Sequence, residues 1–336
     1  MRSAPLTPFA LLFLAPALAV AEAPRIGAAE PKPRTPGTIR LATYNVENLF
    51  DDRDDPSLSG REEDKDDTKP ADHQEAAAEA LRKVNADIVA LQEIESHDAL
   101  IEFREKYAKD LGYTHVQSID VGAERGIEQA VLSRFPIIHT EVWPTLSLNA
   151  KEPETIDGVP NENAGKPMIS RRSPLCVTVE VPAETTGAKP YRVTLLIVHQ
   201  KSGRQFGFWR EAESATNIAI YKRLAGEGAA QNVAILGDFN ATPEQKSVRA
   251  YLDAGLIDPL ASHEPKDPAF ITHASGREID HIFLSPGLAK ELVPNSPFVL
   301  GTPQLRPEED WRTAPKPKGY ASDHLPVVID LKPVDQ

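Results

Sequence analysis

The chain has 336 residues, of which 40% are hydrophobic and 26% charged, with a formal net charge of −13. This composition is typical of a globular protein with a substantial core, and the single cysteine, Cys176, excludes an internal disulfide. The acidic surplus counts against a nucleic-acid partner. However, residues 51–67 alone hold nine acidic and three basic residues, so the rest of the chain is closer to balance and the charge decides little.

The first residues are typical of an export signal. Arg2 precedes an apolar stretch over residues 6–20, and A-x-A cleavage sites follow at residues 19–21 and 21–23. The apolar stretch is shorter than the roughly 20 residues that a membrane span needs, and it contains prolines. We therefore expect residues 1–23 to be a signal peptide and the mature protein to be exported, to the periplasm or beyond.

The remaining chain predicts one mixed domain. Residues 24–37, rich in Pro, Ala and Gly, are expected to be a disordered linker, and residues 38–336 to form the domain. Alternating or apolar runs predict strands, and Ala/Glu/Lys-rich or periodic stretches predict helices. In chain order we expect a strand at 38–44, a helix at 71–86, a strand at 87–92, a helix at 97–110, strands at 114–119, 130–133, 177–181 and 193–198, a helix at 208–224, a strand at 232–236, a helix at 243–254, and strands at 279–284 and 327–331. Such a mixture indicates a layered α/β or α+β domain.

Polar side chains gather where the predicted strands end. Taken singly, each Asp or Asn there is typical of a turn or a helix cap. Together they predict a pocket rich in oxygen ligands, with two or more histidines and no cysteine. Such a site favours Mg²⁺, Mn²⁺ or Ca²⁺ over structural zinc, and these hard cations suit phosphoryl chemistry.

Six blocks resemble the endonuclease/exonuclease/phosphatase superfamily in identity and in order: TYNVENLF, ALQEIE, VHQKSG, ILGDFNATP, EIDHIFLSP and SDHLPV. The resemblance spans residues 38–333. It implies a four-layer α/β/β/α sandwich of two packed β-sheets and a site in a cleft at one edge. It also implies a phosphoric ester hydrolase that depends on Mg²⁺, Mn²⁺ or Ca²⁺.

The resemblance assigns metal-binding roles to four residues. Glu93 is similar to the family's main metal-ligand carboxylate. The other three are an amide that supports the site and two further acids: Asn45, Glu47 and Asp323.

The resemblance also assigns the catalytic groups. Asp238 resembles the residue that orients or deprotonates the attacking water, and Asn240 the amide that bonds the phosphoryl oxygens or that nucleophile. His324 resembles the imidazole that contacts the scissile phosphate. His199 and Asp280 are similar to a second His/Asp pair, in which the carboxylate orients the ring.

Three further positions are candidates for substrate binding. Glu128 stands where some members place an acid that pairs with the last histidine. Arg172 aligns with a phosphate-contacting arginine, with Arg171 as the alternative. Lys201, together with Arg204 and Arg210, is expected near the cleft, where each would meet phosphates, although Lys201 and Arg204 are equally typical of solvated loop charges.

The histidines without an assigned role are expected not to be catalytic, and His281 is expected to have a structural or rim role. His281 replaces the tyrosine that many members have after the Asp of the fifth block, and strand alternation predicts that it points away from Asp280. The remaining histidines, His273 among them, are expected to be solvated or packed without partners.

The opening block and the His-Gln-Lys-Ser sequence at 199–202 look most like secreted bacterial nucleases. We therefore predict a monomeric exported nuclease of low sequence specificity. The alternative is a sphingomyelinase-like or small-phosphate hydrolase, for which Trp143 and Trp311 would be the membrane-contacting candidates. A catalytically inactive binding module is disfavoured because every block retains its reactive residue.

Overall fold

The computed structural model describes residues 26–53, 55, 58, 68–226, 231–261, 267–306 and 308–334. The predicted signal peptide and most of the acidic stretch at 51–67 lie outside these residues. Within them, no helix is both long and apolar enough to cross a membrane.

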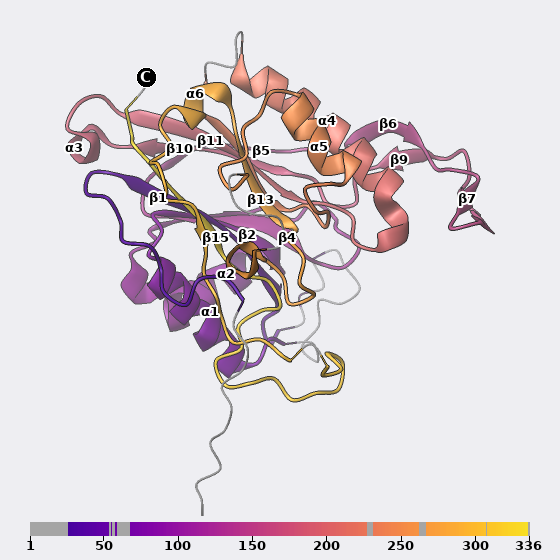
Figure 1. Cartoon of the computed structure of the whole chain (residues 1–336), viewed down its shortest axis with the longest axis horizontal. Coiled ribbons are helices and arrows are strands. Elements are labelled where there is room, and N and C mark those ends of the chain that lie inside the picture. Colours follow the sequence, from indigo (N-terminus) through magenta and orange to yellow (C-terminus); the bar gives the residue numbers. More distant parts are fainter. Residues whose placement is uncertain are drawn as a thin grey trace, which may run out of the picture.

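Two large β-sheets form the centre of the domain (Figure 1). The first has six strands in the order β14-β15-β1-β2-β4-β3, and the second has five in the order β13-β12-β11-β10-β5. The first sheet consists of β1 (Ile39–Leu49), β2 (Ile88–Ile94), β3 (His115–Ser118), β4 (Glu128–Ser133), β14 (Phe298–Val299) and β15 (Val327–Leu331). The second consists of β5 (Ile137–Val142), β10 (Leu175–Val181), β11 (Tyr191–His199), β12 (Val233–Asp238) and β13 (Asp280–Leu284).

Helices and two small hairpins complete the fold. The helices are α1 (Ala71–Val84), α2 (His97–Tyr107), α3 (Ala183–Thr186), α4 (Gly207–Ala225), α5 (Lys246–Asp253) and α6 (Pro286–Ala289). The hairpins pair β6 (Ser147–Lys151) with β9 (Pro167–Ile169) and β7 (Thr155–Ile156) with β8 (Val159–Pro160). In Figure 1 they extend away from the body of the domain beyond α4.

Three apolar clusters show how the layers pack. The largest lies between the two sheets, with Leu41 and Ala90 facing Leu195 and Leu236. A second lies between the first sheet and helices α1 and α2, and a third between the second sheet and helices α4 and α5. The four-layer α/β/β/α sandwich is therefore confirmed, and the two sheets bring their strand ends to a common edge.

Local sequence explains the ends of the helices on the first sheet. The Ser96 side chain accepts a hydrogen bond from the Ala99 N–H and so caps the start of α2. Asn85 follows the last residue of α1 and caps the helix. Its φ of 50° lies in the left-handed region, which Asn adopts more readily than most residues, and its N–H donates to the Leu81 carbonyl. Both helices begin at the residues expected from the sequence.

Residues 26–37 correct the expectation of a disordered linker. Ala28 pairs with Leu300 next to the first sheet, and Lys32 Nζ donates to the carbonyls of Asn295 and Pro297. Arg34 forms an ion pair with both carboxylate oxygens of Asp87. This segment is therefore part of the folded domain, because its polar groups are satisfied by the domain rather than by solvent.

Candidate active site

Three predicted catalytic residues lie in one row across the second sheet. His199 at the end of β11 pairs in register with Asp238 at the end of β12, and Asp238 pairs with Asp280 at the start of β13. Side chains opposite one another on adjacent strands share a face of the sheet. The sheet register therefore gathers residues that are about 40 positions apart in sequence.

Close packing in this row requires glycine before Asp238. Gly237 has a φ of 143°, and a Cβ on it would lie 2.0 Å from the Val198 carbonyl oxygen. No side chain fits at that distance, so the Gly-Asp order of the fourth block is dictated by the backbone.

Asp238 is held by amides from both sheets. One carboxylate oxygen accepts from Asn45 Nδ2 of β1 at 3.2 Å and from Asn240 Nδ2 at 3.0 Å, and the other accepts from the Asn240 N–H at 2.7 Å. Burial raises the pKa of Asp238 to about 6, even though the nearby His324 favours its ionised form. Asn240 therefore positions Asp238. The sequence predicted a contact of Asn240 with the substrate or the nucleophile, but not this one.

His324 pairs with Asp280, and not with Glu128 of β4 as some family members would suggest. Its Nδ1 lies 3.0 and 2.9 Å from the two Asp280 oxygens, and its Nε2 lies 3.8 Å from Asp238 Oδ2. Burial opposes a charge on this ring, yet the carboxylates of Asp280 and Asp238 raise the pKa of His324 well above its usual value. The predicted pairing of His199 with Asp280 is therefore wrong, because the last block forms a bridge with His273 and brings His324 to that carboxylate.

His199 instead faces two other carboxylates. Its Nε2 lies 3.4 Å from Asp238 Oδ2 and 3.7 Å from Glu93 Oε1. Its Nδ1 is buried without a hydrogen-bond partner among the described residues. Burial, reinforced by Arg172, lowers the pKa of His199 well below its usual value. A neutral His199 thus presents its Nε2 to the centre of the site.

The acidic residues of the first sheet occupy strained backbone positions. Glu47, Asn48 and Glu93 have φ angles of 52°, 52° and 65°, which are uncommon for residues other than glycine and concentrate at functional sites. This conformation interrupts the pairing of β1 with β2 after Asn45. Glu93 Oε2 accepts from the Asn48 N–H at 3.0 Å, and its Oε1 lies 3.7 Å from Arg125.

Glu47 and Asp323 lie next to each other. Glu47 Oε2 accepts from the Tyr320 hydroxyl at 2.6 Å and from the Asp323 N–H at 3.2 Å. Burial and the Asp323 charge raise the pKa of Glu47. The Lys69 ammonium, itself buried, donates to the Glu47 carbonyl at 2.9 Å.

The four predicted metal ligands are only partly brought together. Among the described residues, the groups of three or more acidic, histidine or cysteine ligand atoms within 4.8 Å include Asp323 but neither Glu47 nor Glu93. The donor chemistry nevertheless fits a hard cation. Burial and the Asp323 charge raise the pKa of Glu47, and a divalent ion beside these carboxylates would offset their charge; Asn45 supplies a neutral oxygen beside them.

Glu128 does not pair with the last histidine. Its carboxyl Oε1 accepts from the backbone N–H groups of Val121 and Ala123 at 3.2 and 3.4 Å. Burial raises its pKa to about 8. The predicted pairing is wrong because Asp280 already occupies the position beside His324.

The predicted cationic residues differ in exposure. Arg172 is buried, and its guanidinium donates to the Gln200 carbonyl at 3.4 Å, whereas Arg171 is exposed and lies over the Trp209 ring. Lys201 Nζ lies 4.4 Å from the centre of the Phe206 ring. Arg210 is buried and donates to the carbonyls of Lys201 and Gly203. The expectation that Arg210 meets substrate is therefore wrong, since it holds the loop that carries Lys201.

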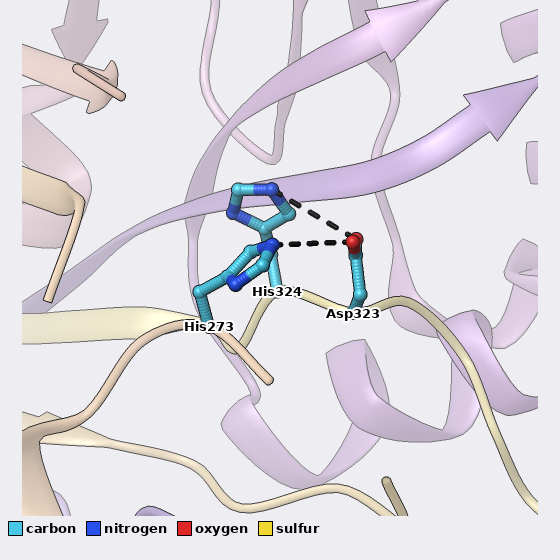
Figure 2. Close-up of side chains that lie close together, drawn as sticks. All are labelled: His273, Asp323 and His324. Carbon is cyan, nitrogen blue, oxygen red and sulfur yellow. Dashed lines mark hydrogen bonds and ion pairs between the residues drawn. The ribbon is translucent and has the colours of Figure 1, made fainter. Parts of the chain in front are cut away.

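The expectation of a structural role holds for His281. His273, which was expected to lack partners, contacts the site (Figure 2). His281 is buried, bonds the Ala241 carbonyl at 2.9 Å and packs on Phe239. His273 Nε2 lies 3.2 Å from Asp323 Oδ2, and its ring contacts the His324 ring edge-on, with 4.6 Å between their centres. No motif or periodicity in the sequence predicts this contact, because it depends on a bridge between residues 273 and 324.

The chain belongs to the Endonuclease/Exonuclease/phosphatase family, whose sequence profile matches residues 42–324. No curated protein sequence matches it significantly.

Solved structures with a similar fold cover most of the chain. The catalytic domain of human nocturnin is 15% identical, with a TM-score of 0.52, and the match covers 88% of this chain and 94% of that one. A mannosyl-6-phosphatase from Bacteroides thetaiotaomicron is 19% identical, with a TM-score of 0.53 and coverage of 87% and 99%. A family member from Beutenbergia cavernae is 22% identical, with a TM-score of 0.54 and coverage of 88% and 71%. These likenesses establish the fold, and the family establishes a phosphoester hydrolase.

Proposed function

We propose that this protein is an exported, metal-dependent phosphodiesterase that cleaves nucleic acid with low sequence specificity. The hydrolytic part of the proposal rests on one observation: the buried Asp238 carboxylate lies between two imidazoles, with its Oδ2 3.4 Å from His199 Nε2 and 3.8 Å from His324 Nε2. Burial lowers the pKa of His199, whereas the carboxylates of Asp280 and Asp238 outweigh burial and raise the pKa of His324. Such a separation of pKa values is typical of a site that moves a proton during hydrolysis.

Each residue has a role that follows from its contacts. Asp238, fixed by Asn45 and Asn240, accepts the proton of the attacking water. His324, kept charged by Asp280, donates from Nε2 to a phosphoryl oxygen of the substrate. As the P–O bond to water forms, the P–O bond to the leaving oxygen breaks.

Glu93, Glu47, Asp323 and Asn45 would hold the metal ion. Mg²⁺ or Mn²⁺ fits these oxygen donors best, with Ca²⁺ as an alternative. When bound, the ion supplies a positive charge that stabilises the negative charge of the transition state.

A cavity beside the site supports an extended, anionic substrate. It has a volume of about 800 Å³, larger than a single phosphate needs, and lies between α1 and residues 300–319. Lys316 lines it and also lies 4.0 Å from Glu47 Oε1. Two acids line it as well: Glu79 is paired with Arg82, and Glu309 accepts a hydrogen bond from the Arg306 N–H. The cations that line the cavity are Lys83, Arg306, Lys316 and Lys318.

Four cations along one cavity support a polyanion over a small monoester, since each phosphate contact adds to affinity without reading sequence. The lipid alternative has less support. Trp143 packs against Arg223, and of the two proposed tryptophans only Trp311 is well exposed, at 66%.

The substrate class is tested by incubating the mature protein with plasmid, linear DNA, RNA, mannose 6-phosphate and sphingomyelin. Each is tested with Mg²⁺, Mn²⁺ or Ca²⁺ and with chelator. We expect metal-dependent cleavage of DNA or RNA that weakens as salt rises. Hydrolysis of the sugar phosphate or the lipid, with plasmid and RNA left intact, would overturn the nuclease proposal.

Export is tested separately, by mass spectrometry of the protein from its native host. We expect a mature N-terminus near residue 22 or 24. An intact segment 1–20 on a cytoplasmic protein would contradict export.

A further inference from the structure

Arg125, in the loop between β3 and β4, lies beside the proposed metal ligands and was assigned no role from the sequence. Its Nη2 donates to Asn48 Oδ1 at 2.7 Å, and its Nη1 lies 3.7 Å from Glu93 Oε1. The second separation is longer than a hydrogen bond. Glu93 therefore attracts the guanidinium without binding it through a direct N–H···O contact.

The loop that carries Arg125 is braced from within. Gly126 has a φ of 67°, a left-handed value that favours glycine, and its N–H donates to the Ala123 carbonyl at 2.9 Å. The buried Glu128 carboxyl accepts from the Val121 and Ala123 N–H groups at 3.2 and 3.4 Å. Glu128, which does not pair with the last histidine, thus holds the turn that brings Arg125 to the site.

Arg125 differs from the two arginines that the sequence proposed for phosphate binding. Its side chain is 31% exposed, whereas Arg172 is buried. Arg171 is exposed, but its guanidinium is paired with Glu124. Of the three, Arg125 combines a position beside Glu93 with exposure to solvent, so a substrate can reach it.

We propose that Arg125 binds the phosphate of the substrate, the contact that the sequence assigned to Arg172. A guanidinium presents parallel N–H groups that match two oxygens of a phosphate. This role rests on the proposed function, in that it needs a phosphate ester as the substrate. A cation at this position has two opposite effects, because it attracts the phosphate and repels a metal ion at Glu93.

A purely structural role of Arg125 predicts a different result for the metal. Asn48 and Glu93 have positive φ angles of 52° and 65°. If Arg125 only held these two residues in place, its removal would disturb a metal ligand and weaken metal binding. If it binds phosphate, its removal takes a like charge away from the metal and so strengthens metal binding, while substrate binding weakens. The sign of the change in metal affinity therefore separates the two roles.

The test compares Arg125→Gln and Arg125→Lys with wild-type protein. Mn²⁺ affinity, measured from the EPR signal of the free ion, should rise at least about threefold in Arg125→Gln, because one positive charge is removed. It should stay at the wild-type value in Arg125→Lys. KM for bis(p-nitrophenyl) phosphate in saturating Mg²⁺ should rise roughly 10- to 100-fold in Arg125→Gln, as expected for the loss of hydrogen bonds to a charged group, with a smaller change in kcat. Arg125→Lys, which keeps the charge but not the planar fork, should have an intermediate KM.

Binding of inorganic phosphate in saturating Mg²⁺, measured by calorimetry, gives the same comparison without turnover. Phosphate should bind Arg125→Gln at least about tenfold more weakly than wild type. Arg192→Gln is the matched control, because it removes an exposed arginine, paired with Glu180, near the start of β11 and thus at the opposite end of that strand from His199. It should leave the Mn²⁺ affinity, the KM and the phosphate affinity unchanged.

KM and phosphate affinity within threefold of wild type in folded Arg125→Gln would overturn the proposal, and so would weaker Mn²⁺ binding in that variant. Folding is checked by the melting temperature. If Arg125→Gln does not fold, Arg125→Lys decides, and an unchanged KM in that variant would overturn the role. If wild type hydrolyses bis(p-nitrophenyl) phosphate or mannose 6-phosphate but leaves plasmid and RNA intact, the nuclease proposal fails, whereas a raised KM for that ester in Arg125→Gln still upholds the role of Arg125.

Discussion

Replacing Asp280 with Asn tests whether His324 works as a charged group. The substitution keeps the shape of the side chain and removes its charge. Asp280 contacts His324 Nδ1 at 2.9 and 3.0 Å, and both side chains are buried. Breaking a buried pair by neutralising one partner costs about 3–5 kcal/mol. If the imidazolium form is needed in the transition state, that loss corresponds to a fall of roughly 10²- to 10⁴-fold in kcat, at about 1.4 kcal/mol per tenfold.

The assay is steady-state hydrolysis of bis(p-nitrophenyl) phosphate at saturating Mg²⁺, measured across pH. KM should change little, because the loss falls on the transition state. The carboxylates of Asp280 and Asp238 outweigh burial and raise the pKa of His324, so Asp280→Asn should lower it. The alkaline limb of the pH profile should therefore move to lower pH. Asp253→Asn, an exposed position on α5, controls for the loss of one negative charge.

A kcat within threefold of wild type, with an unmoved alkaline limb, would refute the role given to the Asp280–His324 pair. A large loss of kcat with an unmoved limb would show that Asp280 acts on the shape of the site and not on the charge of His324.

Three further predictions follow from single contacts. Burial raises the pKa of Glu128 to about 8, so the folded state keeps a proton that the unfolded state has lost, and stability falls as the pH rises from about 5 to 8. Glu128→Gln should remove this loss and stabilise the protein at pH 8 by up to about 4 kcal/mol, from roughly three pKa units, with no gain at pH 5; equal effects at both pH values in denaturant melts would contradict it. Glu93→Gln should weaken Mg²⁺ binding and lower activity at least about 100-fold, and an unchanged metal titration would exclude Glu93 as a ligand. Loss of Asp238 and loss of His324 should be far from additive in a double-mutant cycle of kcat, because the two share one proton-transfer unit, and multiplicative losses would show that they act independently.

The layers of the fold were predictable because each has its own periodicity. The helix at 71–84 and the strands that end in Gln92-Glu93 and Gly237-Asp238 follow directly from apolar patterning, and the family blocks supply their order. The hairpins over residues 147–169 were not predicted. Their strands are short and largely exposed, so they carry little apolar alternation.

The site residues were predictable by type, whereas their partners depend on register. Asp238 and Asn240 follow from one block of sequence, and their mutual hydrogen bonds are local. The contact of Asp280 with His324 and that of His273 with Asp323 join segments 44 and 50 residues apart. The bridge between His273 and His324 places these segments together, and no pattern within either segment specifies it.

The buried arginines show a second limit of sequence reasoning. Arg172 was expected to contact a substrate phosphate, and Arg210 was expected near the cleft. Both instead donate to backbone carbonyls of the loop after β11. Their guanidinium groups therefore help to hold the shape of this loop.

Single-turnover cleavage of supercoiled plasmid tests the proposed metal-dependent nuclease activity most directly, comparing wild-type protein with Asp238→Asn under Mg²⁺ and under chelator. We predict that wild type nicks the plasmid with Mg²⁺, that chelator abolishes nicking, and that Asp238→Asn is at least about 1,000-fold slower with an unchanged melting temperature, since it removes the proton acceptor. Plasmid cleavage by Asp238→Asn at the wild-type rate, or undiminished cleavage by wild type in chelator, would contradict a metal-dependent nuclease in which Asp238 accepts the proton.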